Sequence, residues 1–314
     1  MPYRLDSRES VQQGLRRCAR EQLDRAIEEL TENVRADPVD AVHSARKALK
    51  KERSLLRLFR GALDSGERRR ENDALRDAGR QLSAARDAEV IVQAVDGLSE
   101  RFAGRVPKPT FDAIQTRFEA ERDPARARLL EFGLTTEVAG KLGAIRSRTD
   151  EWHLRHDGWR AIEPGLVRSY RRGRGALEHV RTDASVDGLH DWRKRTKDLW
   201  YHLRFLSPIS PGIVRGQAKD AHQLADALGD DHDLAVLREQ LDRAGGELAV
   251  DLEPMFELIG HRREQLQQQA VLIGERLYAE KPKAFGRRMH RYWRAWEEEA
   301  RAAGARRPTE PALG

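Results

Sequence analysis

The sequence predicts an all-α fold, and three observations carry that prediction. Alanine, leucine, arginine, glutamate and glutamine dominate the 314 residues, and all of these residue types except alanine carry long side chains that helices accommodate well. Alternating runs rich in valine, isoleucine and tyrosine, which would indicate strands, are absent. Several prolines stand between long helical segments, as expected of helix boundaries. Long helices with short joints favour antiparallel neighbours in bundles.

The first half of the chain is predicted to consist of long helices with few breaks. They cover about 8–36, which Asp37-Pro38 ends, then 39–62, 67–84, 86–97 and 124–149. The segment VPKPT at 106–110 is the clearest loop. Pro124 is expected near the start of the last of these helices, where proline is tolerated.

The second half begins near Glu151. Its helices are expected over about 163–181, 187–206, 211–228, 231–245, 252–279 and 282–303. The prolines at 164, 208, 211, 254 and 282 fall at these joints. Residues 304–314 are predicted to form a disordered tail. One helical domain would then occupy 1–303, in halves of about 8–150 and 151–303.

Composition excludes several protein classes. Hydrophobic residues, at 39%, suffice for a core in a chain of this length. No run of about 18 apolar residues predicts a membrane helix, and the N-terminus lacks the apolar region of a signal peptide. The single cysteine, Cys18, excludes an internal disulfide and a cysteine-rich zinc site. These observations favour a cytoplasmic protein that contacts no membrane and holds no metal or cofactor.

The arrangement of the charges matters more than their sum. Charged residues make up 35% of the chain, yet Lys and Arg exceed Asp and Glu only by 58 to 52. The segment VHSARKALKKERSLLRLF at 42–59 aligns without a gap with LHDWRKRTKDLWYHLRFL at 189–206, and RDAEV at 86–90 aligns with HDLAV at 232–236. The chain is therefore predicted to contain two copies of one helical unit, related by a pseudo-two-fold axis.

Each copy of the first repeated segment has a basic side and an apolar side when its residues are placed 100° apart around a helix. The basic set of the first copy is His43, Arg46, Lys47, Lys50, Lys51, Arg53 and Arg57. That of the second copy is His190, Arg193, Lys194, Lys197 and Arg204. From His43 to Arg57 such a basic stripe is about 21 Å long. Asp191 and Asp198 lie beside the stripe centre and are not expected to neutralise it, a pattern that suits an extended polyanion.

Three other basic segments could extend this surface, with a solvated helix face as the alternative for each. They contribute Arg17, Arg20, Arg168, Arg171, Arg172, Arg174, Lys283 and Arg287. The two histidines that head the stripes are expected to donate to phosphate oxygens or to cap the stripes. Asp87 and Asp233 are expected to cap helices or to hold stripe cations in ion pairs. Zinc would need three or four converging ligands, and no HxxxH or CxxC spacing provides them.

These motifs resemble the signature of the CHAD domain family, the conserved histidine α-helical domains. The resemblance rests on the paired HxxRKxxK segments, on RDAEV and GDDHDLAV, and on YRRGR, and it covers about 8–303. It implies two pseudo-symmetric four-helix bundles that form one α-helical domain. It also implies that inorganic polyphosphate binds in a basic channel or groove between the halves, and it suggests a location at polyphosphate granules. Asp198 in place of Lys51, and Trp200 in place of Arg53, make the two walls unequal in charge.

Two other functions stay open at this point. Nucleic-acid binding predicts aromatic groups among the cations for base stacking, and Tyr201 is the main one there. A metal-dependent phosphohydrolase would use the two stripe histidines with Asp87 and Asp233. Members of this family are often fused to a triphosphate-processing domain of the CYTH type, which has ExExK-like strands. The sequence contains no such ExExK-like segment and no P-loop. We therefore expect a polyphosphate-binding protein without catalytic residues, and nucleic acid is a less favoured partner.

Overall fold

The computed structural model describes residues 3–305 except 103, 132, 245, 247 and 249, and it describes only the backbone of 84–88, 125, 126, 128–131 and 303–305. Within these ranges every extended element is a helix, which confirms the all-α prediction; the one β-type feature is an isolated bridge between Arg60 and Leu63. Of the predicted disordered tail, 304 and 305 belong to the last helix, and 306–314 lie outside the described residues.

The helices follow one another with short connections. The first half contains α1 (Val11–Thr31), α2 (Pro38–Leu58), α3 (Ser65–Gln81), α4 (Ser83–Arg101), α5 (Lys108–Glu131) and α6 (Leu134–Arg148). The second half contains α7 (Trp159–Val180), α8 (Val186–Phe205), α9 (Pro211–Ala244), α10 (Glu253–Leu277) and α11 (Pro282–Ala305). Short 3₁₀ turns lie at Asn33–Arg35, Thr149–Glu151 and Ser207–Ile209.

Two prolines lie inside helices where the sequence predicted helix starts. Pro124 is in the interior of α5, and the break comes instead at Gly133, whose φ of 60° favours glycine. Pro164 lies inside α7, which begins at Trp159. Around Pro164, the buried side chains of Ala161, Ile162 and Leu166 stabilise the helix against the local cost of the proline.

Two loops are also shorter than predicted. The predicted loop at 106–110 is cut short because α5 begins at Lys108, with Pro109 in the first turn where its missing N–H is harmless. The break predicted between 228 and 231 does not occur, because α9 continues through it as one helix of 34 residues. The buried Gly229 and Asp231 in this stretch pack against α8 and α10, and these contacts hold the helix together.

The helices that carry the basic stripes have strong N-terminal signals. The carboxylate of Asp37 accepts hydrogen bonds of 3.0 Å from the backbone N–H groups of Val39 and Asp40, and Pro38 occupies the first helical position of α2. The hydroxyl of Ser185 accepts from the backbone N–H of Gly188 at the start of α8. Local sequence therefore fixes where both stripes begin.

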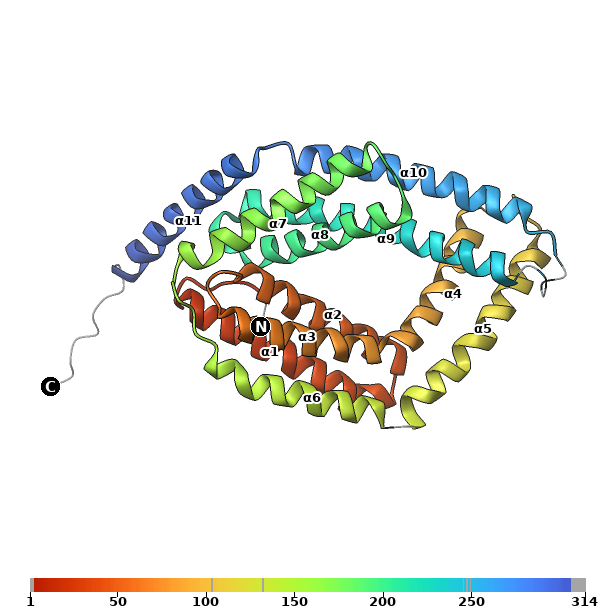
Figure 1. Cartoon of the computed structure of the whole chain (residues 1–314), viewed down its shortest axis with the longest axis horizontal. Helices are drawn as coiled ribbons and strands as arrows, with labels where there is room; N and C mark the ends of the chain where they lie inside the picture. The colour runs from red at the N-terminus through yellow and green to blue at the C-terminus, as the bar shows by residue number, and fades with distance from the viewer. Residues whose placement is uncertain are drawn as a thin grey trace.

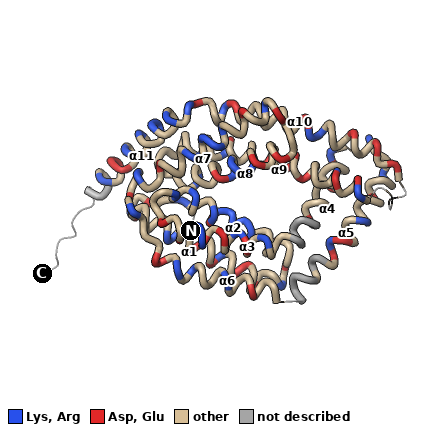
Figure 2. The backbone as a smooth tube through the Cα atoms, in the orientation of Figure 1, with Lys and Arg blue, Asp and Glu red and all other residues tan. Residues whose placement is uncertain are grey.

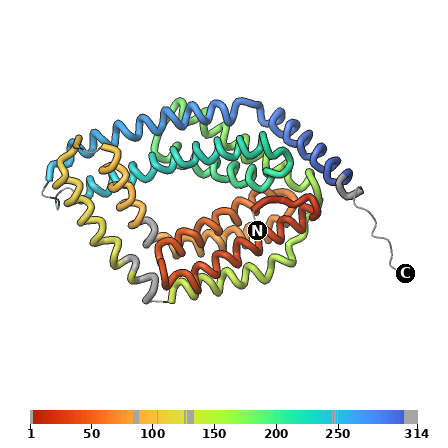
Figure 3. The backbone as a smooth tube through the Cα atoms, turned by 180° about the vertical axis from the view of Figure 1, so that it is seen from behind, coloured from red at the N-terminus to blue at the C-terminus, as the bar shows by residue number. Residues whose placement is uncertain are grey.

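Helices of both halves form a closed circuit of contacts. α2 contacts α8, α8 contacts α9, α9 contacts α4, and α4 contacts α2 (Figure 1). The view from behind shows the same order, with α2 and α8 close together near their C-terminal ends and apart near their N-terminal ends (Figure 3). α1 and α6 cover the first half of this circuit, and α7, α10 and α11 cover the second.

Polar contacts lock α2 and α8 together where they cross. The hydroxyl of Ser54 donates to the backbone carbonyl of Asp198 at 3.2 Å, and Nε2 of His202 donates to the carbonyl of Ser54 at 2.8 Å. Burial lowers the pKa of His202 to about 4, so the ring is neutral. Ser54 aligns with Tyr201 in the predicted repeat, and its partners Asp198 and His202 lie on either side of Tyr201 in the sequence, so the two segments cross near corresponding positions. The duplication itself, and the division of the domain into halves near residue 150, stay predictions.

A close backbone approach joins α7 to the end of α2. A Cβ atom added to Gly165 would lie 1.8 Å from the carbonyl oxygen of Leu58. Only glycine fits at this contact, which holds the second half against the first.

None of the helices in the described ranges has an apolar stretch of the length that a lipid bilayer requires.

Candidate anion-binding surface

Part of the basic stripe of α2 lies toward α8 in the second half of the chain: Arg57 pairs with Asp198, and the charge of Lys47 acts on Lys197. Figure 2 shows Lys and Arg along α2, with α8 and α9 across from it. Lys47 and Lys50 are exposed, whereas His43 and Arg46 are half-buried. The exposed ammonium groups are therefore the most accessible charges of this stripe.

The stripe of α8 approaches that of α2. Lys194 is exposed, and Arg193, Lys197 and Arg204 are half-buried. Burial, the charge of Arg193 and the charge of Lys47 lower the pKa of Lys197 to about 8, against the opposing effect of acids on α9. Because Lys47 belongs to α2, this effect means that the two rows of cations lie within electrostatic reach of each other.

Several of these cations have no acidic partner. In the part of the chain that the structure describes, no ion pair forms to Lys47, Lys51, Arg193, Lys194, Lys197 or Arg204. The Nε atom of Arg193 is also buried without a hydrogen-bond partner. Uncompensated cations that face one another repel, and an anion between them would remove that repulsion.

Other cations of the α2 stripe are tied to neighbouring helices. Arg46 donates to the carbonyl of Gly79 at 3.1 Å, and Arg53 donates to Asn72 of α3 at 3.3 Å. Burial and the charge of Arg57 lower the pKa of Arg53 to about 10. These side chains thus lie toward α3, at one edge of the stripe.

Asp198 differs from its expected role. Rather than leaving the basic side uncompensated, it reaches from α8 to α2, where Nη1 of Arg57 donates to its Oδ1 at 2.7 Å. The prediction considered each helix alone, and this pair forms only because the helices cross.

Lys51 is buried, with 7% of its surface exposed, although the sequence placed it in the stripe. Its Nζ lies 5.9 Å from the ring centroid of Tyr3. Burial and the nearby charges of Arg204, Arg25 and Lys47 lower its pKa to about 8. Lys51 therefore lies among cations at the edge of the α2–α8 crossing.

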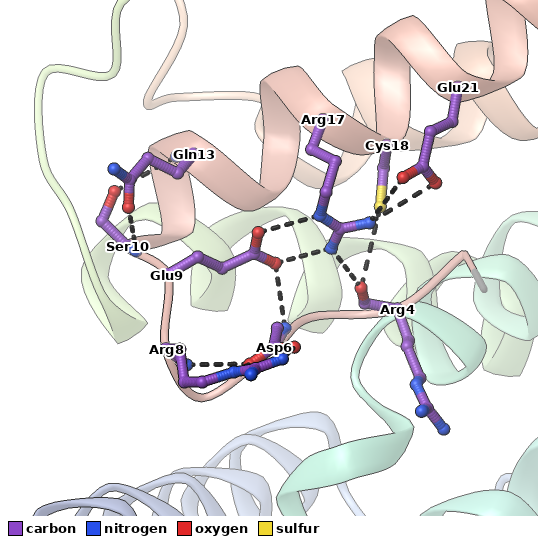
Figure 4. Close-up of polar contacts among 9 residues, drawn as sticks. All are labelled: Arg4, Asp6, Arg8, Glu9, Ser10, Gln13, Arg17, Cys18 and Glu21. Atoms are coloured by element: carbon purple, nitrogen blue, oxygen red, sulfur yellow. Dashed lines mark hydrogen bonds and ion pairs between the residues drawn. The ribbon is translucent and has the colours of Figure 1, made fainter. Parts of the chain in front are cut away.

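The basic segment of α1 has acids of its own. Arg17 forms ion pairs with Glu9 at 2.6 Å and Glu21 at 3.3 Å and donates to the carbonyl of Arg4 at 2.7 Å, which ties the N-terminal segment to α1 (Figure 4). Arg20 pairs with Asp150 at 3.1 Å. Neither is among the uncompensated cations.

The remaining candidates lie on α7 and α11. Arg174 binds the carbonyls of Tyr278 and Glu280 and pairs with Glu178, so it connects α7 to the joint before α11. Burial and the charges of Arg195 and Arg168 lower the pKa of Arg172. The exposed candidates of these helices are Arg168, Arg171, Arg172, Lys283 and Arg287.

Acidic residues on α9, apart from Asp233, were missed by the sequence analysis. Asp226 contacts His222 and, with Asp233, raises the pKa of Lys197. Burial and the charges of Asp233 and Asp226 raise the pKa of Asp230. Asp230 and Asp233 border a cavity of about 650 Å³ between α4, α9 and α10. Asp226, Asp230 and Asp233 are spaced four and three residues apart, which predicts one acidic side on this helix. The sequence does not show which neighbouring helix that side faces.

The GDDHD segment of α9 positions the start of the α8 stripe. A Cβ atom at Gly229 would lie 3.2 Å from the guanidinium of Arg193, so glycine lets Arg193 lie on the α9 backbone. Asp231 is buried and pairs with Arg263 at 3.0 Å, which fastens α10 to α9. The rings of His190 and His232 lie 4.2 Å apart between centroids.

His190, at the start of the α8 stripe, is electrically neutral at neutral pH. Burial, His232 and the adjacent cations Lys194 and Arg193 lower the pKa of His190 to about 4, and its Nδ1 lacks a hydrogen-bond partner. Among the described side chains no group of three His, Cys, Asp or Glu residues could hold a metal ion. The side chain of Asp87 lies outside the described residues, so its predicted role stays a prediction.

Aromatic side chains near the stripe are buried. Trp200 and Tyr201 stack with centroids 4.6 Å apart, and their exposed fractions are 7% and 3%. Tyr201 is therefore not available as a platform for a nucleic-acid base.

Known proteins resemble this chain in sequence and in fold. The model of one protein family, described as CHAD domain, matches residues 17–242. Two proteins of Mycobacterium tuberculosis, Uncharacterized protein MT2285 of strain CDC 1551 / Oshkosh and Uncharacterized protein Rv2226 of strain ATCC 25618 / H37Rv, are each 29% identical over 220 residues. That match covers 66% of this chain and 41% of theirs, so the chain spans about two fifths of the length of these curated relatives.

A solved structure shares the fold. PptA from Streptomyces chartreusis aligns with a TM-score of 0.60 at 14% identity, over 86% of this chain and 98% of that chain. The similarity supports an all-helical architecture common to both proteins.

Proposed function

Because the family model covers well over half of its residues, the chain belongs to the CHAD domain family, and we propose that it binds inorganic polyphosphate between α2 and α8. One observation carries the proposal: Lys47 on α2 and Lys197 on α8, from different halves of the chain, lie within electrostatic reach of each other, and neither forms an ion pair within the described residues.

Polyphosphate matches these rows chemically. It is a linear chain of phosphate groups, each with negatively charged oxygens, so it can contact cations repeatedly along a stripe of about 21 Å. Lysine supplies point charges and arginine supplies paired N–H donors. Burial and the repulsion from neighbouring cations together lower the pKa of Lys197 and Lys51, and binding of an anion would relieve that repulsion.

The acids of α9 constrain the path. Asp226, Asp230 and Asp233 repel phosphate, so the ligand would lie along α2 and α8 and keep away from α9. A channel or groove between the two halves is part of this proposal, as is a location at polyphosphate granules. A fluorescent fusion that stays diffuse in cells containing such granules would argue against that location.

The test is a titration of long-chain polyphosphate against single-stranded DNA and RNA of matched charge, over a series of salt concentrations. We expect tighter binding of polyphosphate and a steep loss of affinity with salt, because binding releases counterions. The Lys50→Glu/Lys197→Glu variant should lose binding, whereas Lys108→Glu/Lys281→Glu has the same charge change at exposed lysines outside both stripes and should retain it. Equal affinity for nucleic acid, or normal binding by the first variant, would refute the proposal.

The proposed role is binding without catalysis. Polyphosphate incubated with the protein should keep its length on gels. Shortening of the polymer that a chelator stops would instead indicate a metal-dependent phosphohydrolase.

A further inference from the structure

The two sides of the α2–α8 crossing carry matching cations with different partners. On one side, Lys51 of α2 lies near Arg204 of α8. On the other side, Asp198 of α8 pairs with Arg57 of α2. In the aligned repeat Lys51 corresponds to Asp198, and Arg57 corresponds to Arg204. The crossing therefore contains two equivalent positions beside an arginine, and one of them holds a lysine whereas the other holds an aspartate.

The Asp198 side is occupied by an internal anion. Asp198 is only 8% exposed, and Nη1 of Arg57 lies 2.7 Å from its Oδ1. Its backbone carbonyl accepts from Ser54, which holds this residue against α2. A carboxylate in this position offers Arg57 the kind of charged oxygen that a phosphate would offer.

The Lys51 side has the cations without the anion. Within the described residues, Lys51 and Arg204 form no ion pair. Aromatic rings hold both in place: Nζ of Lys51 lies 5.9 Å from the centroid of Tyr3, and the Arg204 guanidinium lies 5.5 Å from that of Trp200. Arg25 adds a nearby positive charge, although it also contacts Glu29 at 3.7 Å.

We propose that Lys51 and Arg204 form an open site for one phosphate group, and that Asp198 closes the equivalent place on the opposite side by acting as an internal substitute for phosphate. This inference rests on the proposed function. The ligand chemistry is a phosphate oxyanion, supplied either by an internal unit of polyphosphate or by a short phosphate such as tripolyphosphate.

Exchange of the two residues tests this assignment at constant net charge. Lys51→Asp alone should close the open side and weaken polyphosphate binding by about tenfold, the loss of roughly one charge-assisted contact. Asp198→Lys alone should open the second side and strengthen binding by a similar factor. The double exchange Lys51→Asp/Asp198→Lys should bind like the native chain, because one open site remains.

A control separates a local contact from the general effect of charge. Asp191→Lys makes the same charge change on α8, but Asp191 pairs with Arg195 away from the crossing. It should leave the affinity nearly unchanged. An increase equal to that of Asp198→Lys would overturn the inference, and so would a double exchange that binds as weakly as Lys51→Asp.

Folding and ligand type are checked in the same series. Thermal unfolding identifies variants that lose structure. If Lys51→Asp is one of them, Lys51→Gln replaces it, and we expect a smaller loss of polyphosphate binding. Unchanged binding by Lys51→Gln would count against the inference. If tripolyphosphate binds the native chain but not the Lys51 variant, the site takes short phosphates. If the Lys51 substitution changes only the affinity for long-chain polyphosphate, the site takes an internal unit of the polymer. If the native chain itself fails to prefer polyphosphate, the proposed function fails first.

Discussion

Replacement of Glu52 by leucine should remove a loss of stability that the native chain undergoes between neutral and mildly basic pH. Glu52 is fully buried on the apolar side of α2, and both carboxylate oxygens lack hydrogen-bond partners. Burial and the nearby charge of Glu71 raise its pKa to about 8 from an ordinary 4.5. The aligned position of the second copy holds Leu199, so leucine is a side chain that this packing position accepts.

The size of the effect follows from the proton balance. Between pH 4.5 and 8 the folded chain keeps a proton on Glu52 that the unfolded chain has released, so stability falls as pH rises. Each pH unit costs about 1.4 kcal/mol while that difference lasts. His190 and His202 act in the opposite direction, but only below pH 6.5, because their pKa values are lowered from 6.5 to about 4. Between pH 6.5 and 8 we expect Glu52 to account for about 1.5 to 2 kcal/mol.

The assay is urea unfolding of the native chain and the Glu52→Leu variant at both ends of this window. The difference in unfolding free energy between the two should grow by the stated amount as pH rises. As a control, Glu28→Leu removes an exposed acid from α1, and the unfolding free energy of this variant should depend on pH in the same way as that of the native chain. Parallel pH profiles for the native chain and Glu52→Leu would refute the reasoning.

Three other changes have defined outcomes. Gly229→Ala should weaken polyphosphate binding severalfold in a titration by displacing the guanidinium that lies on it, while Gly216→Ala, on the same helix with open space around it, should not. Gly165→Ala should lower the unfolding free energy by about 3 kcal/mol or more in urea, because the added methyl meets a backbone carbonyl. Polyphosphate affinity should fall as pH rises through about 8, with proton uptake on binding in calorimetry, because Lys51 and Lys197 lose their charge there; an affinity that stays constant through that range contradicts this assignment.

The sequence was most informative about features that one helix expresses alone. Helical composition, capping residues and the two cationic stripes are local properties, and the structure has both stripes on the expected helices. Proline positions were less reliable guides: Pro124 and Pro164 both lie inside helices, and at Pro164 the buried Ile162 and Leu166 on its two sides keep the helix packed. A single chain segment does not reveal such packing in advance.

Contacts between helices could not be predicted in the same way. The pair between Arg57 and Asp198 exists only because α2 crosses α8 at Ser54. Likewise, Asp226 acts on Lys197 because α9 packs beside α8, and the sequence alone does not show that these two helices are neighbours. Charge balance at the site is thus a property of the assembled helices.

The N-terminal segment determines where other polypeptides can be attached without obstructing the crossing. The ring of Tyr3 lies under Lys51, its hydroxyl donates to the backbone carbonyl of Lys51 at 3.2 Å, and the N–H of Leu5 donates to the carbonyl of Phe205 at 3.0 Å. A fusion partner placed ahead of Tyr3 would therefore start beside the cations of the crossing. The C-terminal end of α11 projects away from the other helices (Figure 1), so a reporter or immobilisation tag joined there starts outside the circuit of helices.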